Sequence, residues 1–157
     1  MEIGHFYFLD ESYYQDFPDE DIQKNHETIN WQLHDKPCFC AVGGQAEGIF
    51  WLVPISSKTI KYRKIEAQKI SRYKKCDTIK FGMVLGYERA FLLQNMIPAT
   101  DSYISAEYIN QGNPVRVDGA FERELINAAS DVLAKHRRGI KLIFPDIDAI
   151  ENKLINR

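Results

Sequence analysis

The sequence contains no apolar run long enough to cross a membrane as a helix, and acids stand near its start where a secretory signal would carry basic residues. We therefore expect a cytoplasmic protein. Only three cysteines occur, at Cys38, Cys40 and Cys76. Three thiols cannot all pair within one chain, and no nearby histidine stands at the spacing that would complete a zinc site. We expect buried free thiols, no metal and no cofactor.

The motifs of common small-molecule enzymes are also missing. The chain has no Gly-rich phosphate loop, no H-E-x-x-H and no G-x-S-x-G, so an enzyme of that kind lacks support. The 157 residues, of which 45% are apolar, are typical of one soluble globular domain. We expect a single domain over residues 1–157.

The charge is unevenly distributed, although the formal net charge is only -2. Residues 1–36 carry nine acids and two lysines, a balance of -7, whereas residues 58–80 carry nine bases against Glu66 and Asp77, a balance of +7. A concentrated basic segment attracts polyanions whatever the total charge is. The expected partner is nucleic acid.

The hydrophobic pattern predicts an α+β domain in which helices pack against a mostly antiparallel sheet. Strands are expected at 5–10 and 102–109, and as two hairpins, 38–44 with 48–55 and 78–86 with 89–98. Two shorter strands are expected at 114–118 and 141–144.

Helices are predicted at 10–17, 118–138 and 145–156, where acids stand at the start of each segment. Apolar residues at three- and four-residue steps support the second of these. Residues 18–35 have no steady period and predict a loop. Residues 59–75 show only a thin apolar stripe among charges, and we expect a partly irregular, exposed segment there.

Two hydroxyl groups and an ammonium, those of Ser56, Ser57 and Lys58, follow directly after the apolar run 48–55. Cleavage of RNA without a metal requires the ribose 2'-hydroxyl to attack its own phosphate, and donors must stabilise the charge that develops on phosphorus. Side chains at the end of a strand are well placed to do this. The alternative is that these are turn serines followed by a solvated lysine.

Four short segments occur in an order that resembles the ToxN/AbiQ family, which are endoribonuclease toxins of type III toxin-antitoxin systems active in phage defence. These are FYFLDESYYQDF at 6–17, KPCFCAV at 36–42, LVPISSK at 52–58 and QNMIP at 94–98. The resemblance spans roughly residues 6–140 and is greatest to the CptN and TenpN branch of bacterial toxins. It implies a compact, twisted antiparallel sheet with a barrel-like core and surrounding helices, as in the Kid and MazF toxins.

The resemblance also implies an activity. We expect metal-independent, sequence-specific cleavage of RNA that leaves a 2',3'-cyclic phosphate and a 5'-hydroxyl, with cellular mRNA as substrate. The expected inhibitor is a small pseudoknotted antitoxin RNA, which the toxin processes from a repeat transcript and with which it forms a closed assembly. The RNA cleavage motif does not follow from the residues.

By the same resemblance, Lys58 is the principal catalytic residue, Ser56 and Ser57 contact the scissile phosphate, and Tyr13 and Lys36 line the pocket. The best-known members read Thr-Ser-Pro-Lys, whereas here Ser57 and Lys58 are adjacent. That difference leaves open whether Lys58 is a base or stabilises charge. It also keeps a noncatalytic RNA-binding protein as the alternative function.

A purely structural interpretation stays open for two of these positions. Tyr13 could be a core residue, with Tyr14 as the wall of the pocket, and Lys36 could be solvated surface. Among the histidines, His34 is the leading candidate for an acid or base because it stands near Lys36 in the sequence.

The basic segment is expected to follow RNA phosphates with its cations and to stack on unpaired bases with its tyrosines. The alternative is a solvated charged face. A second basic strip could come from Arg137, Arg138 and Lys141. The predicted RNA-binding residues are Lys61, Tyr62, Arg63, Lys64, Lys69, Arg72, Lys74 and Lys75.

Overall fold

The structure is a computed structural model that describes residues 1–22, 26–29 and 32–157, with the backbone alone at 26–29 and 32–35. Its main sheet has seven strands, β1 (Phe6–Leu9), β4 (Cys38–Gly43), β5 (Phe50–Ser56), β6 (Ile79–Val84), β7 (Tyr87–Leu92), β8 (Ile97–Ala99) and β9 (Ile104–Glu107). Two separate hairpins are β2 (His26–Ile29) with β3 (Gln32–Asp35) and β10 (Ile109–Asn110) with β11 (Asn113–Pro114).

The main sheet follows the order β6-β7-β5-β4-β1-β9, and β8 pairs with the first half of β5. Each of these pairings is antiparallel. The long strand β5 therefore joins two halves: its start pairs with β4 and β8, and its end pairs with β7. The residues that follow β5 therefore lie at the junction between the two halves of the sheet.

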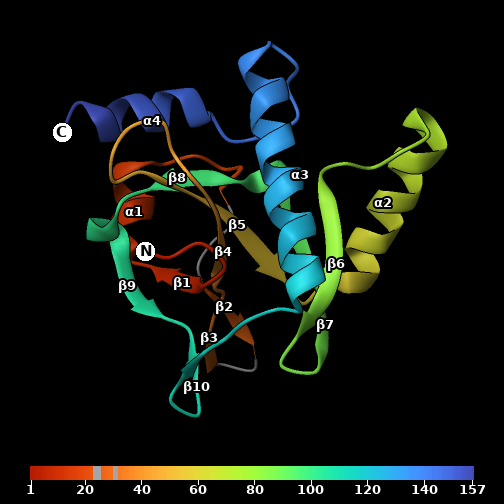
Figure 1. Cartoon of the computed structure of the whole chain (residues 1–157), viewed down its shortest axis with the longest axis horizontal. Coiled ribbons are helices and arrows are strands. Elements are labelled where there is room, and N and C mark those ends of the chain that lie inside the picture. Colours follow the sequence, from red (N-terminus) through yellow and green to blue (C-terminus); the bar gives the residue numbers. More distant parts are fainter. Residues whose placement is uncertain (23–25, 30–31) are drawn as a thin grey trace.

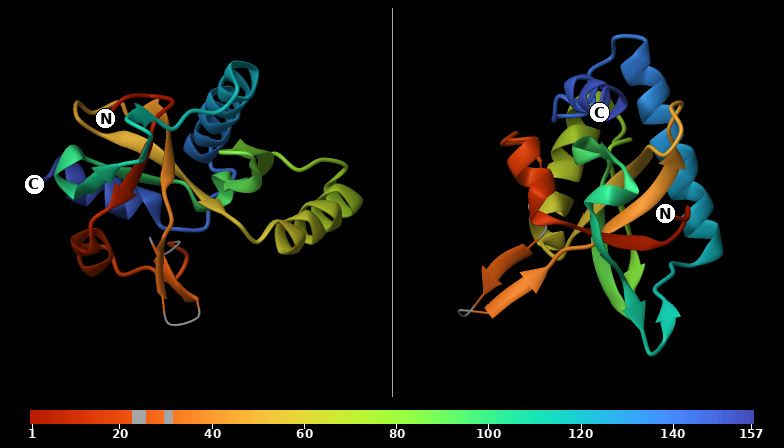
Figure 2. Two further views of the ribbon diagram at one scale, coloured as in Figure 1. Left: turned by 90° about the horizontal axis from the view of Figure 1, so that it is seen from below. Right: turned by 90° about the vertical axis from the view of Figure 1, so that its left-hand side faces the viewer.

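Four α-helices surround the sheet: α1 (Glu11–Asp16), α2 (Thr59–Tyr73), α3 (Gly119–Arg137) and α4 (Ile147–Ile155). Short 3-10 turns occur at Leu93–Asn95 and Asp101–Tyr103. In Figure 1, α2 lies beyond β6 and β7 at one side of the molecule, and α1 and α4 lie at the opposite side. The views in Figure 2 show the β2–β3 and β10–β11 hairpins projecting away from this body. The predicted α+β class is confirmed.

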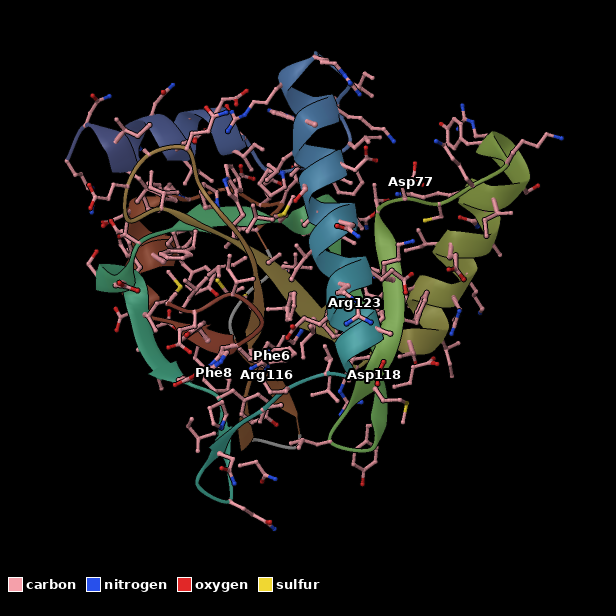
Figure 3. The ribbon with its side chains drawn as sticks, in the orientation of Figure 1. Phe6, Phe8, Asp77, Arg116, Asp118 and Arg123 are labelled. Carbon is pink, nitrogen blue, oxygen red and sulfur yellow. The ribbon has the colours of Figure 1, made fainter. Side chains whose placement is uncertain are left out.

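Three of the helices begin with an aspartate cap, as their sequences predicted. Asp10 accepts the backbone N–H of Ser12 at the start of α1, Asp118 accepts that of Ala120 at the start of α3, and Asp146 accepts that of Ala149 in α4. Asp118 is labelled at the foot of α3 in Figure 3. These caps set the boundaries of the helices that cover the sheet.

Three clusters of buried side chains hold the elements together. The largest joins α3 to strands β1, β4, β5 and β7, with Phe6, Trp51, Phe91 and Leu125 among its members. The second joins α1 and α4 to other side chains of β1, β4 and β5 and to β8, and it includes Tyr13. The third is small: it has four buried residues and packs α2 against β6 and β7 through Tyr62.

The sequence prediction for residues 59–75 was wrong, because most of this segment is the regular helix α2. Lys, Arg, Glu, Gln and Ala have high helix propensity, so a narrow apolar contact is enough to hold such a helix. Tyr62 and Ile65 form that contact, and the Arg63 guanidinium lies 3.7 Å from the centre of the Phe81 ring.

Three other expectations need correction. Residues 26–29 and 32–35 pair as antiparallel strands where a loop was predicted; they pair outside the main sheet, so they need no alternating apolar pattern. Residues 141–144 are not a strand: Phe144 donates its N–H to Gln94 O over 2.8 Å, and Ile143 is buried in the largest cluster. Only residues 113–114 of the region around 114–118 are extended in a ladder, and Val115 and Val117 are core residues.

Candidate active site at the start of α2

The predicted catalytic residues Ser56, Ser57 and Lys58 form the connection between β5 and α2. Ser56 ends the strand and is buried, with its Oγ accepting the backbone N–H of Lys58 over 3.1 Å. Ser57 and Lys58 are exposed. Because one serine hydroxyl is held against the backbone and the other faces solvent, the connection presents a hydroxyl and an ammonium on a fixed turn.

The start of α2 is favourable for an anion. Lys58 is its N-cap residue without a side-chain cap, and the first turn holds no acid. Thr59 donates its N–H to Ser57 O, and Tyr62 donates to Lys58 O. The N–H groups of Ile60 and Lys61 lie in the first turn, where the helix has no carbonyl four residues earlier to accept them. Within the described residues they are therefore available to a ligand, together with the positive end of the helix dipole.

The register of β4 and β5 relates Lys36 to this connection. Cys38, the first residue of β4, pairs with Pro54, so continuing this antiparallel register by two residues places Lys36, just before β4, opposite Ser56, the last residue of β5. Lys36 is half-buried. The ladder thus brings Lys36 toward the serines and Lys58, although twenty residues separate them in sequence. His34 lies on β3, and its side chain falls outside the described residues.

Tyr13 occupies a different environment from the others. Its side chain has 0% exposure, and its hydroxyl donates to Pro98 O on β8 over 2.7 Å. Burial raises the pKa of the Tyr13 hydroxyl well above its ordinary value. These contacts support the core role that the sequence left open, and the contact of Tyr13 with RNA stays a prediction.

The predicted RNA-binding residues lie on α2 and the two residues after it, and they divide into two groups. Lys61, Arg63, Lys64, Arg72, Lys74 and Lys75 are exposed. Arg63 is paired with Glu66 and Glu88. Tyr62 is 5% exposed and packs on the strands, and the half-buried Lys69 donates to Thr78 and Gln94. The exposed group forms a basic surface, whereas the side chains of Tyr62 and Lys69 contact other residues of the fold.

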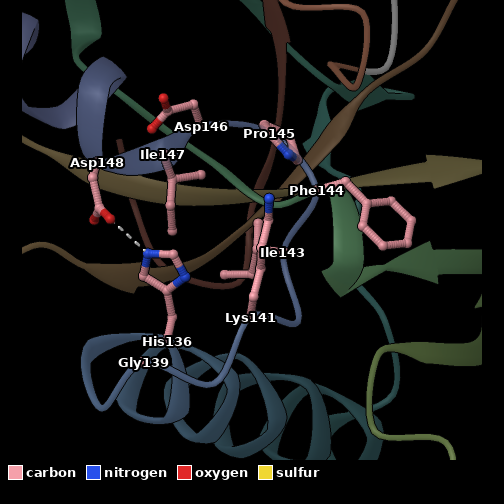
Figure 4. A pocket seen from close by; sticks show the side chains of 9 residues that line it. All are labelled: His136, Gly139, Lys141, Ile143, Phe144, Pro145, Asp146, Ile147 and Asp148. Carbon is pink, nitrogen blue, oxygen red and sulfur yellow. Dashed lines mark hydrogen bonds and ion pairs between the residues drawn. The ribbon is translucent and has the colours of Figure 1, made fainter.

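A cavity of about 350 Å³ lies where α3 meets α4, a site that the sequence did not indicate. Figure 4 shows His136 on one side of it and Lys141 and Phe144 on the other. His136 Nε2 is 3.0 Å from Asp148 Oδ2, whereas its Nδ1 is buried without a hydrogen-bond partner. The lining residues all lie within residues 136–148, a stretch without a recognisable binding motif, so no sequence signal indicated the cavity.

The described residues hold no group of three or more histidine, cysteine, aspartate and glutamate side chains that could bind a metal ion. Within the same part of the chain, no helix combines the length and the apolar content required to span a bilayer. Cys38 and Cys40 are buried free thiols, as predicted, and burial raises the pKa of each to about 12. Cys76 is a half-exposed free thiol.

No protein-family model and no curated protein matches this chain. Its structure is nevertheless similar to that of an α+β protein of the toxin class that the motifs resemble. That protein is AbiQ, described as a lactococcal anti-phage endoribonuclease belonging to the type-III toxin-antitoxin system. The TM-score is 0.62 at 15% sequence identity, and the alignment covers 95% of this chain and 94% of AbiQ.

This likeness extends over nearly the whole of both chains, so it concerns the complete fold and not one shared motif. The predicted structural resemblance to the ToxN/AbiQ group is confirmed at the level of the fold. At 15% identity the likeness carries no information about individual site residues. The chemistry must be argued from the site itself.

Proposed function

We propose that this protein is an endoribonuclease toxin that cleaves RNA at a phosphate bound by the start of α2. The observation that carries the proposal is the uncapped, acid-free helix start at which Ser57 and Lys58 are exposed. Similarity to AbiQ over 95% of the chain supports it independently.

The proposed reaction needs no group beyond the RNA and the protein. The ribose 2'-oxygen forms a bond to phosphorus and loses its proton, the bond from phosphorus to the 5'-oxygen breaks, and the leaving oxygen gains a proton. The products are a 2',3'-cyclic phosphate and a 5'-hydroxyl. The main task of the protein is to stabilise negative charge on the pentavalent phosphorus, which fixed cations and N–H groups do well.

Each side chain has a role that follows from its position. Lys58 places an ammonium beside the phosphate, and Ser57 donates a hydrogen bond to a phosphate oxygen. Ser56 holds the turn through the Lys58 N–H and can donate its own hydroxyl. Lys36 approaches from the segment just before β4 and adds a second cation. Tyr13 supports β8 from within the core.

The exposed cations of α2 extend the phosphate site along one side of the molecule. We propose that they bind single-stranded segments of two RNAs: cellular mRNA as substrate, and a small pseudoknotted antitoxin RNA that the protein cuts from a repeat transcript. The antitoxin RNA would bridge neighbouring copies of the protein in a closed assembly. The separation of acidic and basic residues along the chain suits alternation of protein and RNA.

The test is cleavage of RNA by purified wild-type protein and by Lys58→Ala and Ser57→Ala, with Lys153→Ala on α4 as a matched lysine control. Loss of one charge-stabilising donor should lower the cleavage rate by about 10²–10³-fold. The products are analysed for the proposed 2',3'-cyclic phosphate ends. Thermal melting checks that each variant is folded. Expression of the wild type should arrest growth, and expression of Lys58→Ala should not.

The alternative is a noncatalytic RNA-binding protein, which the adjacency of Ser57 and Lys58 favours because family members place a proline between the corresponding residues. In that case wild-type protein binds RNA without cutting it. Unchanged cleavage in both Lys58→Ala and Ser57→Ala would instead remove the proposed site while leaving a nuclease.

A further inference from the structure

A second cavity, of about 490 Å³, lies at the other end of α2 from Lys58. Side chains from the last turns of α2, from residues 74–78 and from residues 141–144 line it. The fifteen residues of α2 make a helix about 22 Å long, so the cavity is well separated from the candidate active site. Its volume is in the range of small-ligand sites.

One wall of the cavity carries a half-buried ammonium without a negative partner. Lys69 Nζ donates to Thr78 Oγ1 over 2.8 Å and to Gln94 Oε1 over 2.7 Å, and both acceptors are neutral. Within residues 1–22 and 36–157, no carboxylate is ion-paired with Lys69. Burial lowers its pKa. A partly desolvated cation of this kind is stabilised when an anion enters the cavity.

The remaining charged groups of the lining also favour an anion. Asp77, labelled beside the ends of α2 and α3 in Figure 3, lies 3.1 Å from Lys75 Nζ and 3.4 Å from Lys135 Nζ, so two ammonium groups already neutralise it. Lys141 is exposed on the opposite wall. The lining thus contains three lysines and one carboxylate, a charge balance of +2. The lysines are Lys69, Lys75 and Lys141.

Two aromatic rings complete the cavity. Tyr73 is 60% exposed and Phe144 is 46% exposed, so both rings are accessible to a ligand. Lys69 Nζ lies 5.7 Å from the centre of the Phe144 ring, so the buried charge and one ring adjoin. Accessible rings beside cations are the combination that binds a nucleobase by stacking and its phosphate by charge.

We propose that this cavity binds one nucleotide of a single-stranded RNA, with the base against Phe144 or Tyr73 and its phosphate between Lys69 and Lys141. The inference rests on the proposed function, and it adds a base-binding subsite remote from the bond that is cut. The site would hold the strand in register on α2.

A line of cations on α2 connects the two sites. Lys61, Lys64 and Arg72 follow one another at three- and eight-residue steps that keep them on one side of the helix, and Lys75 lies just after its end. At the duplex spacing of about 3.4 Å per nucleotide, the helix length corresponds to about six or seven nucleotides. A dodecamer can therefore occupy both sites together.

The neighbouring 350 Å³ cavity, drawn in Figure 4, also has Lys141 and Phe144 in its lining, but this lining includes Asp146 and Asp148 as well. Asp148 is paired with Arg137, and the lining holds only one lysine beside the two carboxylates, so this cavity lacks the excess of cations that favours a phosphate. The nucleotide is therefore assigned to the cavity beside Lys69, and Lys141 and Phe144 form the wall between the two.

Cys76 lines the proposed subsite and reports on its occupancy. The thiols of Cys38 and Cys40 are buried with a pKa of about 12, so an alkylating reagent at pH 8 should modify Cys76 alone. The experiment measures the rate of alkylation at Cys76 by mass spectrometry with and without a 2'-O-methyl adenosine dodecamer. This probe lacks the attacking hydroxyl and cannot be cut.

The dodecamer should slow alkylation of Cys76 in the wild type. Phe144→Ala and Tyr73→Ala should each bind it about fivefold to a hundredfold more weakly by fluorescence anisotropy, the usual cost of removing one stacked ring. Ile109→Ala removes a side chain as exposed as Phe144, at 46%, from the β10–β11 hairpin and serves as control. All four side chains that change or report are at least partly exposed, so melting temperatures should stay equal.

Unchanged alkylation of Cys76 at saturating dodecamer, or Phe144→Ala binding as tightly as Ile109→Ala, would overturn the proposal. Equal protection by AMP at equal concentration would overturn the assignment to a strand. Because the probe is not cleavable, failure here is distinct from failure of the proposed function: protein that cuts RNA without protecting Cys76 keeps its function and loses this subsite.

Discussion

At the scale of single residues, position in the fold separates side chains that the sequence presented alike. Lys58 and Lys69 belong to the same basic segment, yet Lys58 is exposed at the start of α2 and Lys69 is half-buried against Thr78 and Gln94. Tyr62 and Tyr73 differ in the same way, with 5% and 60% exposure. A lysine or tyrosine on the basic segment therefore has an environment that depends on the side of the helix from which it projects.

Asp77 provides a residue-scale prediction about pH. Partial burial raises its pKa, hydrogen bonds from Lys75 and Lys135 lower it more, and the net pKa is below its ordinary value. A carboxyl whose pKa is lower in the folded state stabilises the fold above its unfolded pKa of about 4, and this contribution disappears as the pH falls through the folded pKa.

Asp77→Asn should therefore reduce the free energy of unfolding at pH 7 by about 0.5–1 kcal/mol, the range for solvent-screened ion pairs. The difference from wild type should shrink as the pH falls below the unfolded pKa of about 4. Urea unfolding at pH 7 and at a series of lower pH values measures this difference in the free energy of unfolding. Asp118→Asn is not a suitable control, because Asp118 caps α3. A constant difference at all pH values would contradict the assignment to the two ammonium groups.

At the scale of elements, the prediction from sequence succeeded where one apolar face and a cap coincide. Residues 118–138 have both, and α3 was predicted to within a residue or two. The α2 segment fails the same test because Lys69 occupies a position on its inward side, where an apolar residue would have revealed the stripe. The β2–β3 hairpin pairs only with itself and carries no core pattern.

The two candidate sites were predictable to different extents for the same reason. The hairpin of β4 and β5 follows from residues 38–55 alone, so the approach of Lys36 to Ser56 can be extrapolated from its register. The cavity beside Lys69 joins residues 69–78 to residues 141–144. No local pattern relates segments more than sixty residues apart, and only the packed structure brings them together.

The packing of α3 on the β6–β7 hairpin depends on a glycine. A Cβ atom at Gly82 would overlap the ring of Phe121, which also packs edge-on against Phe91 at 5.2 Å between ring centres. Gly82→Ala should destabilise the protein by about 1–3 kcal/mol, as overpacking usually does. Urea unfolding measures the loss.

Gly43→Ala is the matched control for that substitution, because a Cβ atom there meets nothing within 4 Å and Gly43 does not require a positive φ. It should change stability by less than about 0.5 kcal/mol. Equal effects of the two substitutions would show that the close approach of Phe121 does not matter.

The basic surface of α2 predicts the salt dependence of RNA binding. Each phosphate contact on a single strand contributes about -0.7 to the slope of log K against log salt. Lys61→Gln and Lys64→Gln should each make the slope shallower by about that amount, and Lys153→Gln on α4 should leave it unchanged. Anisotropy titrations of the uncleavable dodecamer over a range of salt concentrations measure these slopes. Equal slopes for all three variants would place the RNA elsewhere.

At the scale of the whole molecule, opposite charges gather on separate parts of the chain, and α2 lies beyond one edge of the sheet (Figure 1). A protein with one basic side can bind an RNA on that side, while its other side attracts a second RNA less strongly. An RNA that reaches two proteins then links copies without direct contact between the proteins.

We therefore expect the protein with its antitoxin RNA to have a mass that is a whole multiple, greater than one, of one protein plus one RNA. Light scattering coupled to size-exclusion chromatography measures this mass before and after ribonuclease treatment, which should return the free protein. A complex of one protein with one RNA would contradict the closed assembly, although it would not affect the cleavage site.

The third buried cluster, which attaches α2, has four members, against eighteen and fourteen in the other two. Less apolar burial means that this helix opens to solvent at a smaller cost than the central strands. Its amide protons should therefore exchange with deuterium sooner than those of β4 and β5. An oligonucleotide bound at both ends of α2 would stabilise the helix against opening and slow the exchange of its amide protons.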